Sequence, residues 1–249
     1  EVARISPMEI ICNDQVKLRA CLQREMQNAS EQPSAWFQLA NATEALCRHF
    51  ALNDLSPLGL SDEYKAGASA AGALMRYLSE TQKNALEHMT SLRIYQGSET
   101  MLLDRNTRRN LELTESIRGR SRKGSLLWLL DKTSTAMGGR LLRAWVERPL
   151  LSPVQIRRRL GAVEELVGDN VLRGELIRCL REIGDMQRLV SRAVYGSANG
   201  RDLHALALCC AQLPNLTALL KDVHSAALRD IAQMDTLADL CARIDRAIC

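Results

Sequence analysis

Apolar residues recur at steps of three and four through the second half of the chain, which is the spacing of one face of an α-helix. The longest run lies between residues 152 and 194. Its apolar positions are Ile156, Leu160, Val163, Val167, Leu172, Leu176, Leu180, Ile183, Met186 and Val190. Gly168-Asp169-Asn170 predicts a break within this run. Similar patterns predict helices over 66–88, 125–131, 139–146, 201–213, 216–232 and 237–249.

The first 55 residues mix short strand and helix signals instead. The pattern predicts a strand over 8–12, a helix over 14–28, a turn-rich stretch over 28–33 and an edge strand over 36–39. Asn41, with Glu44 three residues later, predicts the start of a helix that runs to Phe50. Strands that alternate with helices indicate the closing part of an α/β domain.

A loop over 53–65 separates this part from the helical remainder, which gives predicted domains at 1–60 and 61–249. Two short strand signals, 91–95 and 100–103, flank Gln96-Gly97-Ser98 and predict a β-hairpin. The predicted fold is therefore mainly α, with long helices and a small hairpin, preceded by the C-terminal part of an α/β domain.

Composition agrees with helices, because Leu, Ala and Arg are abundant and aromatic residues make up 4% of the chain. A net charge of +4 does not by itself indicate nucleic-acid binding. None of the eight cysteines forms a Cys-x-x-Cys pair, and no histidine lies at the spacing of a zinc-finger ligand. We therefore expect no metal site. Free cysteines without a signal peptide or a membrane-spanning run favour the cytoplasm.

The sequence contains none of the common motifs for phosphate, dinucleotide or zinc binding. The chain has no Gly-x-x-x-x-Gly-Lys phosphate loop, no Gly-x-Gly-x-x-Gly signature and no His-Glu-x-x-His motif. We therefore expect no catalytic residue and no bound cofactor in this chain. The adjacent Cys209 and Cys210 invite a redox interpretation, but in a predicted helix cysteine more simply fills apolar space.

The stretch from 101 to 160 is more specific. It reads Met-Leu-Leu-Asp-Arg-Asn-Thr-Arg-Arg-Asn-Leu-Glu-Leu from Met101, and Leu-Asp-Lys-Thr-Ser-Thr-Ala-Met-Gly-Gly-Arg-Leu-Leu-Arg-Ala-Trp from Leu130, before Pro149-Leu150. This stretch resembles the core domain of the MutS DNA mismatch repair family. Similar motifs lie on both sides, at Tyr77–Gln82, Ile183–Leu189 and Arg201–Leu203.

The resemblance implies that the chain comprises parts of two domains of a longer protein. Residues 1–60 are then the end of a ribonuclease-H-like connector domain, and 61–249 are the core domain with its outgoing lever helices. Both ends look cut from a longer chain, whose mismatch-binding, clamp and ATPase domains lie elsewhere. The implied intact protein is a homodimer that binds mismatched duplex DNA, uses ATP with Mg²⁺ and recruits MutL. In the family, MutL docks on the connector domain, and residues 41–50 would be the matching helix here. Within the intact protein, this segment would couple the ATPase end to the DNA end.

The resemblance also indicates a structural hub, a set of residues that hold the helices at fixed angles by packing and capping. Its members are Asn110, Leu111, Asp131, Thr133, Thr135, Gly138, Arg140, Trp145 and Pro149. Side-chain oxygens of Asp131, Thr133 and Thr135 are expected to cap the helix that follows. Apolar surface is expected from Leu127, Leu130, Leu141, Leu142 and Trp145.

A basic loop follows the first part of this motif. Arg118, Arg120, Arg122 and Lys123 stand within six residues of one another. One hypothesis is contact with DNA phosphates. The alternative is a solvated loop whose arginines pair with neighbouring helices.

Other functions compete with a coupling segment. The chain could be a stand-alone helical protein-interaction module, or the core of a MutS paralogue with another DNA-processing role. A nuclease in the N-terminal part would need a carboxylate cluster around a divalent metal, and residues 1–55 show no such arrangement.

Overall fold

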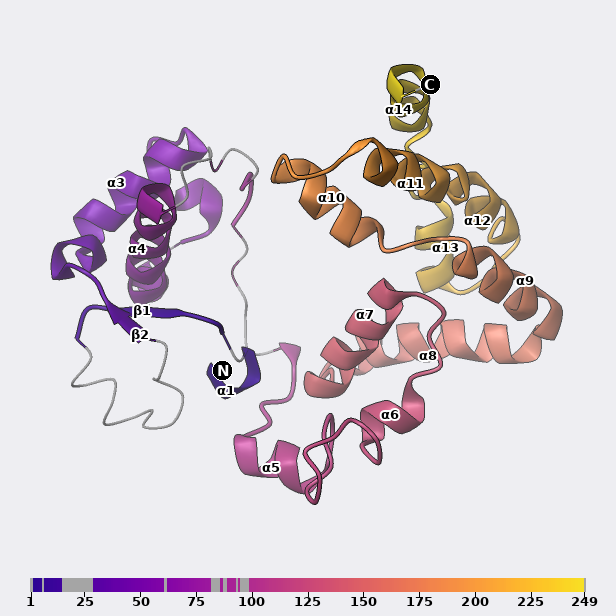
Figure 1. Ribbon diagram of the computed structural model, residues 1–249. Helices are drawn as coiled ribbons and strands as arrows, with labels where there is room; N and C mark the ends of the chain where they lie inside the picture. Colours follow the sequence, from indigo (N-terminus) through magenta and orange to yellow (C-terminus); the bar gives the residue numbers. More distant parts are fainter. Residues whose placement is uncertain are drawn as a thin grey trace. The chain divides into compact units, whose positions relative to one another are not determined.

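The computed structural model describes residues 2–5, 7–14, 29–60, 62–81, 86, 89–92, 94 and 99–248. The chain divides into two compact units, Glu1–Gln96 and Gly97–Cys249, and the predicted mainly helical fold is confirmed (Figure 1). Within the described residues no helix is both long and apolar enough to cross a membrane.

The described residues of the first unit include two short strands and two longer helices that pack on each other. Its elements are α1 (Val2–Ile5), β1 (Ile10–Cys12), β2 (Ala29–Glu31), the 3₁₀ helix η2 (Ser34–Phe37), α3 (Leu39–Phe50), the 3₁₀ helices η3 (Ser56–Leu58) and η4 (Asp62–Tyr64), and α4 (Lys65–Thr81). The strands pair in parallel, with Ile10 opposite Ala29 and Cys12 opposite Glu31.

Helices α3 and α4 pack closely because small residues line their contact. Ala42 and Leu46 of α3 are fully buried, as is Ala73 of α4. At Gly72 of α4, an added Cβ atom would lie 2.4 Å from the Cα atom of Ala42. The absence of a side chain at this position therefore sets the distance between the two helices.

Several predictions for this unit need correction. Residues 36–39 form no strand: Ser34–Phe37 is a 3₁₀ helix that begins after Pro33. Asn41 does not begin helix α3 but lies inside it, where its side-chain amide donates to the carbonyl oxygen of Ala35 at 2.7 Å. The turn-rich stretch contains β2. The strand expected over 8–12 is present as β1, whereas residues 15–28 of the helix expected over 14–28 lie outside the described residues.

The predicted division at residues 60 and 61 differs from the compact units. Helix α4 was assigned to the second domain, yet it packs on α3 and belongs to the first unit. The sequence suggested a boundary at the polar loop over 53–65, but that loop only joins two helices of one unit. Burial of Ala68, Ala73 and Met75 against α3 and η2 outweighs the loop as a domain signal.

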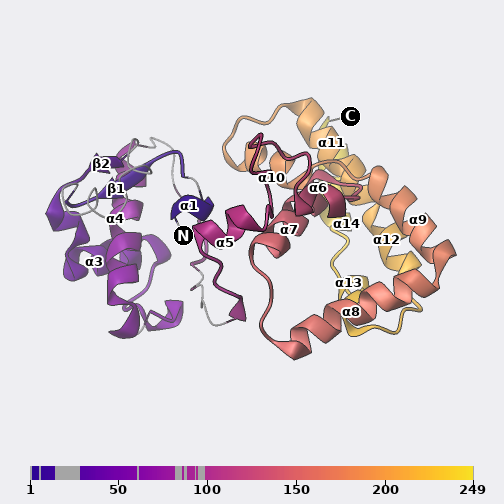
Figure 2. The same ribbon diagram turned by 90° about the horizontal axis from the view of Figure 1, so that it is seen from below.

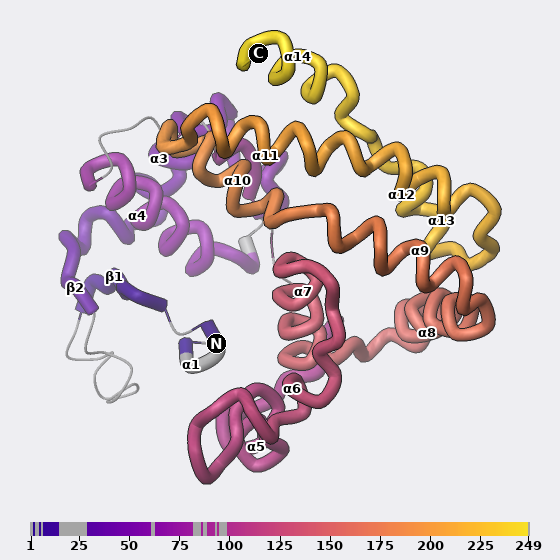
Figure 3. The backbone as a smooth tube through the Cα atoms, turned by 45° about the vertical axis from the view of Figure 1, so that its right-hand side comes forward, coloured from indigo at the N-terminus to yellow at the C-terminus, as the bar shows by residue number. Residues whose placement is uncertain are grey.

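The second unit is an array of short helices. They are α5 (Arg105–Asn110), α6 (Leu126–Leu130), α7 (Ala136–Glu147), α8 (Pro153–Gly168), α9 (Asn170–Arg181), α10 (Met186–Val194), α11 (Gly200–Ala211), α12 (Leu213–Leu219), α13 (Ala226–Ala232) and α14 (Ala238–Ile248). Figure 2 and Figure 3 both show α8, α9, α12 and α13 gathered at one side of this unit. The break predicted at 168–170 separates α8 from α9.

Two neighbouring apolar clusters hold this array together. One joins α9, α11, α12 and α13 through Leu176, Ile183, Cys209, Leu213, Leu216, Leu220, Val223 and Leu228. The other joins α11 to α14 through Leu206, Ala207, Cys210 and Ile244. Cys209 and Cys210 therefore face different clusters, and both are buried, as expected for apolar filling. Burial raises the pKa of the Cys210 thiol.

The hairpin expected around Gln96–Ser98 is only partly testable, since 93 and 95–98 lie outside the described residues. Thr100 does not pair within a described hairpin but forms an antiparallel bridge with Leu150. The Met101 amide donates to the Pro149 carbonyl at 2.8 Å, and the Leu151 amide donates to Glu99 at 3.1 Å. The segment that precedes the hub, 99–101, is thus paired with the segment that follows it, 149–151.

Helix α8 presents its apolar stripe to solvent within the described structure. Leu160, Val163 and Val167 are 57%, 56% and 63% exposed. The helix is held on its other side instead: Arg158 pairs with Asp230 of α13, and Glu165 accepts backbone N–H groups of His224 and Ser225 at 2.6 and 2.8 Å. Periodicity predicted the helix correctly, but not which face the unit buries.

Candidate functional site

The predicted hub is centred on helix α7, which begins after a run of polar side chains. Thr135 is the N-cap residue, and its hydroxyl oxygen accepts the backbone N–H of Gly138 at 2.9 Å. Asp131 accepts both the hydroxyl and the backbone N–H of Thr133, at 2.6 and 3.1 Å. These hydrogen bonds, together with Arg122, hold the pKa of Asp131 below its usual value. Among the described contacts, Thr135 thus caps α7 as expected, whereas Asp131 and Thr133 bond to each other in the turn before the helix and do not cap it.

Gly138 lies against this cap. A Cβ atom there would be 3.0 Å from the Thr135 hydroxyl oxygen and 3.4 Å from the Cβ atom of Thr133. The neighbouring Gly139 faces the Thr133 hydroxyl oxygen, which a Cβ atom would approach to 3.3 Å. The two glycines thus let the first turn of α7 sit directly on the two threonines.

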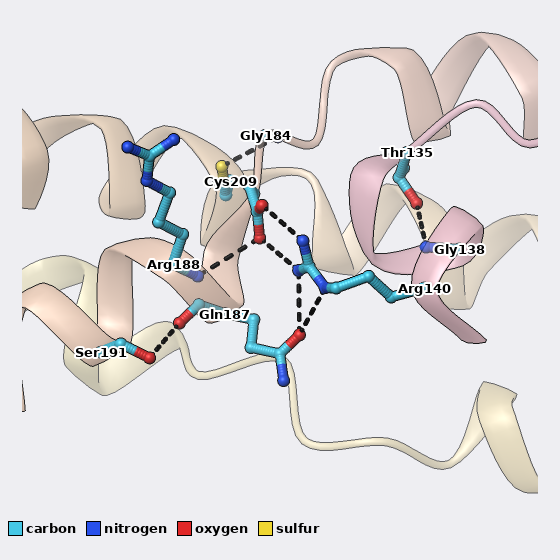
Figure 4. A network of polar contacts seen from close by, with 9 residues as sticks. Thr135, Gly138, Arg140, Gly184, Gln187, Arg188, Ser191 and Cys209 are labelled. Atoms are coloured by element: carbon cyan, nitrogen blue, oxygen red, sulfur yellow. Dashed lines mark hydrogen bonds and ion pairs between the residues drawn. The ribbon is translucent and has the colours of Figure 1, made fainter. Parts of the chain in front are cut away.

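Arg140 of α7 makes the most extensive polar contact of the hub (Figure 4). Its guanidinium donates to both carboxylate oxygens of Asp185, Nη1 to Oδ2 at 2.8 Å and Nη2 to Oδ1 at 2.6 Å. Nε and Nη2 also donate to Oε1 of Gln187, at 3.1 and 2.9 Å. A bidentate pair of this kind fixes orientation as well as distance. Helix α7 is therefore tied to the start of α10, 45 residues further along the chain.

Asp185 occupies a corner that is itself fixed from two sides. Its carboxylate caps α10 by accepting the backbone N–H of Arg188 at 3.2 Å. Next to it, Gly184 donates its backbone N–H to the Cys209 sulfur at 3.2 Å, which ties the corner to α11. The hydrogen bonds from Arg140, followed by that from Arg188, lower the pKa of Asp185 to about 2. The carboxylate is consequently ionised at neutral pH.

The far end of α7 is also held by polar contacts. The guanidinium carbon of Arg159, on α8, lies 3.7 Å from the centre of the Trp145 ring. Glu147 pairs with Arg108 of α5 at 3.3 Å and with Arg143 of its own helix at 3.1 Å. Helix α7 has no buried residue of its own, so these contacts, together with Met137 packed on the apolar core, position it.

Two of the predicted hub residues lie apart from this network. Asn110 ends α5 and Leu111 is its C-cap residue, and both are exposed, Leu111 by 59%. Pro149 contributes through its carbonyl oxygen, which accepts the Met101 amide. The hub in the structure therefore consists of the cap, Arg140, Trp145 and Pro149.

The expected apolar surface is only partly buried. Leu127 is 3% exposed beneath the loop that joins α5 to α6, and the Leu127 amide donates to the Leu113 carbonyl at 2.9 Å. In contrast, Leu130, Leu141 and Trp145 are 48%, 53% and 40% exposed. The five residues lie on two helices, α6 and α7, and the described part of the chain covers only one of them fully.

The four basic loop residues do not share one role. Arg122 pairs with Asp131 and so belongs to the hub. Arg118, Arg120 and Lys123 are exposed, and no ion pair joins them to a described carboxylate. Arg122 thus fits the interpretation of a paired arginine, whereas contact of the other three residues with DNA phosphates stays a prediction.

Sequence reasoning missed the partners that complete the site: Asp185, Gln187, Arg159, Arg108 and Glu147. Asp185 and Gln187 lie in a motif that carried the family resemblance, but nothing local indicates that they face a residue near position 140. Across the described ranges, no group of three or more His, Cys, Asp or Glu side chains is placed to hold a metal ion.

Comparison with known proteins gives two family matches. The family described as MutS domain II matches residues 1–90, and that described as MutS domain III matches residues 106–249. The boundary between the compact units falls between the two matches.

Curated relatives match across both units. A DNA mismatch repair protein MutS from Lachnoclostridium phytofermentans is 40% identical over 254 residues, covering 100% of this chain and 27% of the relative. One from Alkaliphilus oremlandii is 45% identical over 213 residues, covering 85% and 24%. One from Symbiobacterium thermophilum is 41% identical over 253 residues, covering 100% and 29%. The chain thus spans less than a third of the length of these relatives.

Proposed function

The chain belongs to the MutS family of DNA mismatch repair proteins, within which it spans domains II and III, and we propose that it is a mechanical link without chemistry of its own. In this proposal it couples an ATPase end to a mismatch-binding end, both supplied by other parts of a longer protein. That protein would act in the cytoplasm as a homodimer, bind mismatched duplex DNA, use ATP with Mg²⁺ and recruit MutL. The names of the relatives support the link to mismatch repair.

The arrangement of α7 is the observation that carries the proposal. Its first turn is capped by Thr135, its middle is locked to Asp185 by Arg140, and its end is held by Arg108 and Arg159. These directional polar contacts, together with Met137 packed on the apolar core, set its position. Such a helix has a defined orientation but little buried area to hold it in a single state. Coupling requires an element with two arrangements that both ends can bias, and we propose that α7 is this element.

The test replaces the matching segment of Symbiobacterium thermophilum MutS with residues 1–249 and measures ATP hydrolysis with matched and mismatched duplex DNA. Arg140→Gln removes both bonds to the Asp185 carboxylate. We expect it to reduce the mismatch-dependent change in ATP hydrolysis by about tenfold or more, the effect of roughly 1.4 kcal/mol of lost coupling. Basal hydrolysis and duplex binding should stay close to those of the unsubstituted chimera.

Two further variants make the test specific. Asp185→Asn retains an N-cap for α10, so a similar loss with Arg140→Gln, and no added loss in the double variant, would assign the effect to the pair. Arg143→Gln changes an exposed arginine on the same helix, whose partner Glu147 lies one turn away, and should leave the coupling intact. Undiminished coupling in Arg140→Gln would contradict the role given to this contact.

A protein-interaction module is the second candidate, and the exposed stripe of α8 favours it. Leu160, Val163 and Val167 could receive an amphipathic helix. This candidate predicts that the α8 stripe binds a separate protein and that Arg140→Gln leaves its binding unchanged. Loss of coupling in the chimera would favour the mechanical link over this candidate.

A further inference from the structure

The loop that joins α5 to α6 places three cations at an exposed surface. Arg118, Arg120 and Lys123 are exposed, whereas Glu115 is the one carboxylate between residues 113 and 124. Arg122, between them in sequence, turns back to Asp131. The loop therefore divides its basic residues into one that anchors it and three that remain available to an anion.

The loop backbone is fixed by its own hydrogen bonds. The Ser116 amide donates to the Ser121 carbonyl at 2.9 Å, and the Arg120 amide donates to the Ser116 carbonyl at 3.0 Å. The Ile117 amide donates to the Glu112 carboxylate at 2.6 Å. At its end, the buried Ser125 hydroxyl donates to the Arg122 carbonyl at 2.7 Å. The three exposed cations thus stand on an ordered turn, which lowers the entropy lost when an anion binds.

Arg120 has a backbone conformation that disfavours it. Its φ of 45° lies in the left-handed region, where glycine is the unstrained choice. A long cationic side chain at such a position, next to Gly119 in sequence, has a conformational cost that glycine would not have. Strained residues of this kind cluster at ligand-binding sites, although Ala51, Glu112 and Leu237 also have a positive φ.

We propose that the loop from Glu115 to Gly124 binds the phosphate backbone of duplex DNA through Arg118, Arg120 and Lys123. The contact is independent of base sequence, because each side chain supplies a positive charge and hydrogen-bond donors to phosphate oxygens. The choice of duplex DNA rests on the proposed function, whereas the site itself rests on the geometry of the loop.

The experiment measures binding of a short labelled duplex to the 249-residue chain as salt is raised. Three phosphate contacts should weaken binding roughly 40-fold between about 50 and 200 mM salt. The triple variant Arg118→Ala, Arg120→Ala, Lys123→Ala should lose most of this affinity and almost all of the salt dependence that the loop contributes. A control that removes the same charge elsewhere, Arg181→Ala, Arg201→Ala, Lys221→Ala, should retain both.

Arg120→Gly separates binding from folding. It removes one cation and relieves the left-handed strain, so the variant should unfold at the same or a higher temperature and still bind the duplex more weakly. No duplex binding at low salt, or equal losses in the control variant, would overturn the loop site while leaving the coupling proposal untouched. Loop-dependent binding to phosphatidylserine vesicles or single-stranded RNA, with none to the duplex, would also overturn it.

Discussion

Substituting Gly72 with alanine is expected to destabilise the first unit by about 1–3 kcal/mol or more, the usual range for overpacking. The new Cβ atom would meet the Cα, Cβ and carbonyl oxygen atoms of Ala42, all within 2.5 Å. Two of these are backbone atoms, so no side-chain rotation can relieve the contact and α3 must move away from α4. Hydrogen exchange of peptides from α3 and α4 would report the loss as faster exchange confined to this unit.

A matched substitution on the same helix has the opposite expected sign. Gly67 also lies in α4, but a Cβ atom added there would meet no packed neighbour within 4 Å. Gly67→Ala should therefore stabilise α4 by up to about 1 kcal/mol, because alanine is the better helix former. Equal effects of the two substitutions would show that close approach at Gly72 does not determine the packing of α3 on α4.

Leu127→Ala is expected to have the second large effect, a loss of about 2–5 kcal/mol in local stability. Leu127 is 3% exposed and, with Leu113 and Ser125, is one of three buried residues between positions 99 and 150. Its truncation would remove most of the buried apolar side chain beside the loop that joins α5 to α6, whose Leu113 carbonyl accepts the Leu127 amide. Hydrogen exchange over residues 111–147 should increase, with a smaller change in α11 and α12.

Leu129→Ala provides the control, because Leu129 lies on the same short helix and is 61% exposed. Its truncation should change stability by less than about 0.5 kcal/mol. An equally large loss in Leu129→Ala would mean that another surface covers α6 and that Leu127 is not the specific anchor of the hub.

Local signals were sufficient to predict much of the helical unit. Ser125 and Thr135 each occupy an N-cap position, as residues of this type before an apolar run predict. Strand β2 was missed because Ala29-Ser30-Glu31 shows no apolar alternation and is defined only by its pairing with β1. Trp36 misled the prediction, since an aromatic residue near Phe37 and Leu39 suggests a strand, whereas Pro33 begins a 3₁₀ helix.

In the candidate site, too, local contacts could be predicted from the sequence and long-range contacts could not. The cap that Thr135 places on α7 is a local contact that the sequence predicts, whereas Asp131 and Thr133, expected to cap the same helix, bond to each other instead. The lock between Arg140 and Asp185 spans 45 residues, so only the packed structure brings the two side chains together. The burial of the apolar face of α8 could not be predicted for another reason. Periodicity identifies the residues that share one face of a helix, but not the surface that covers them.

The affinity of the 249-residue chain for two duplexes that differ by one mismatched base pair, measured at low salt, tests the central claim most directly. A segment that links other parts, and contacts DNA only through phosphates, should bind the two duplexes equally, whether that binding is strong or weak. A preference of about tenfold or more for the mismatched duplex, equivalent to about 1.4 kcal/mol, would place mismatch recognition within these residues and contradict the account.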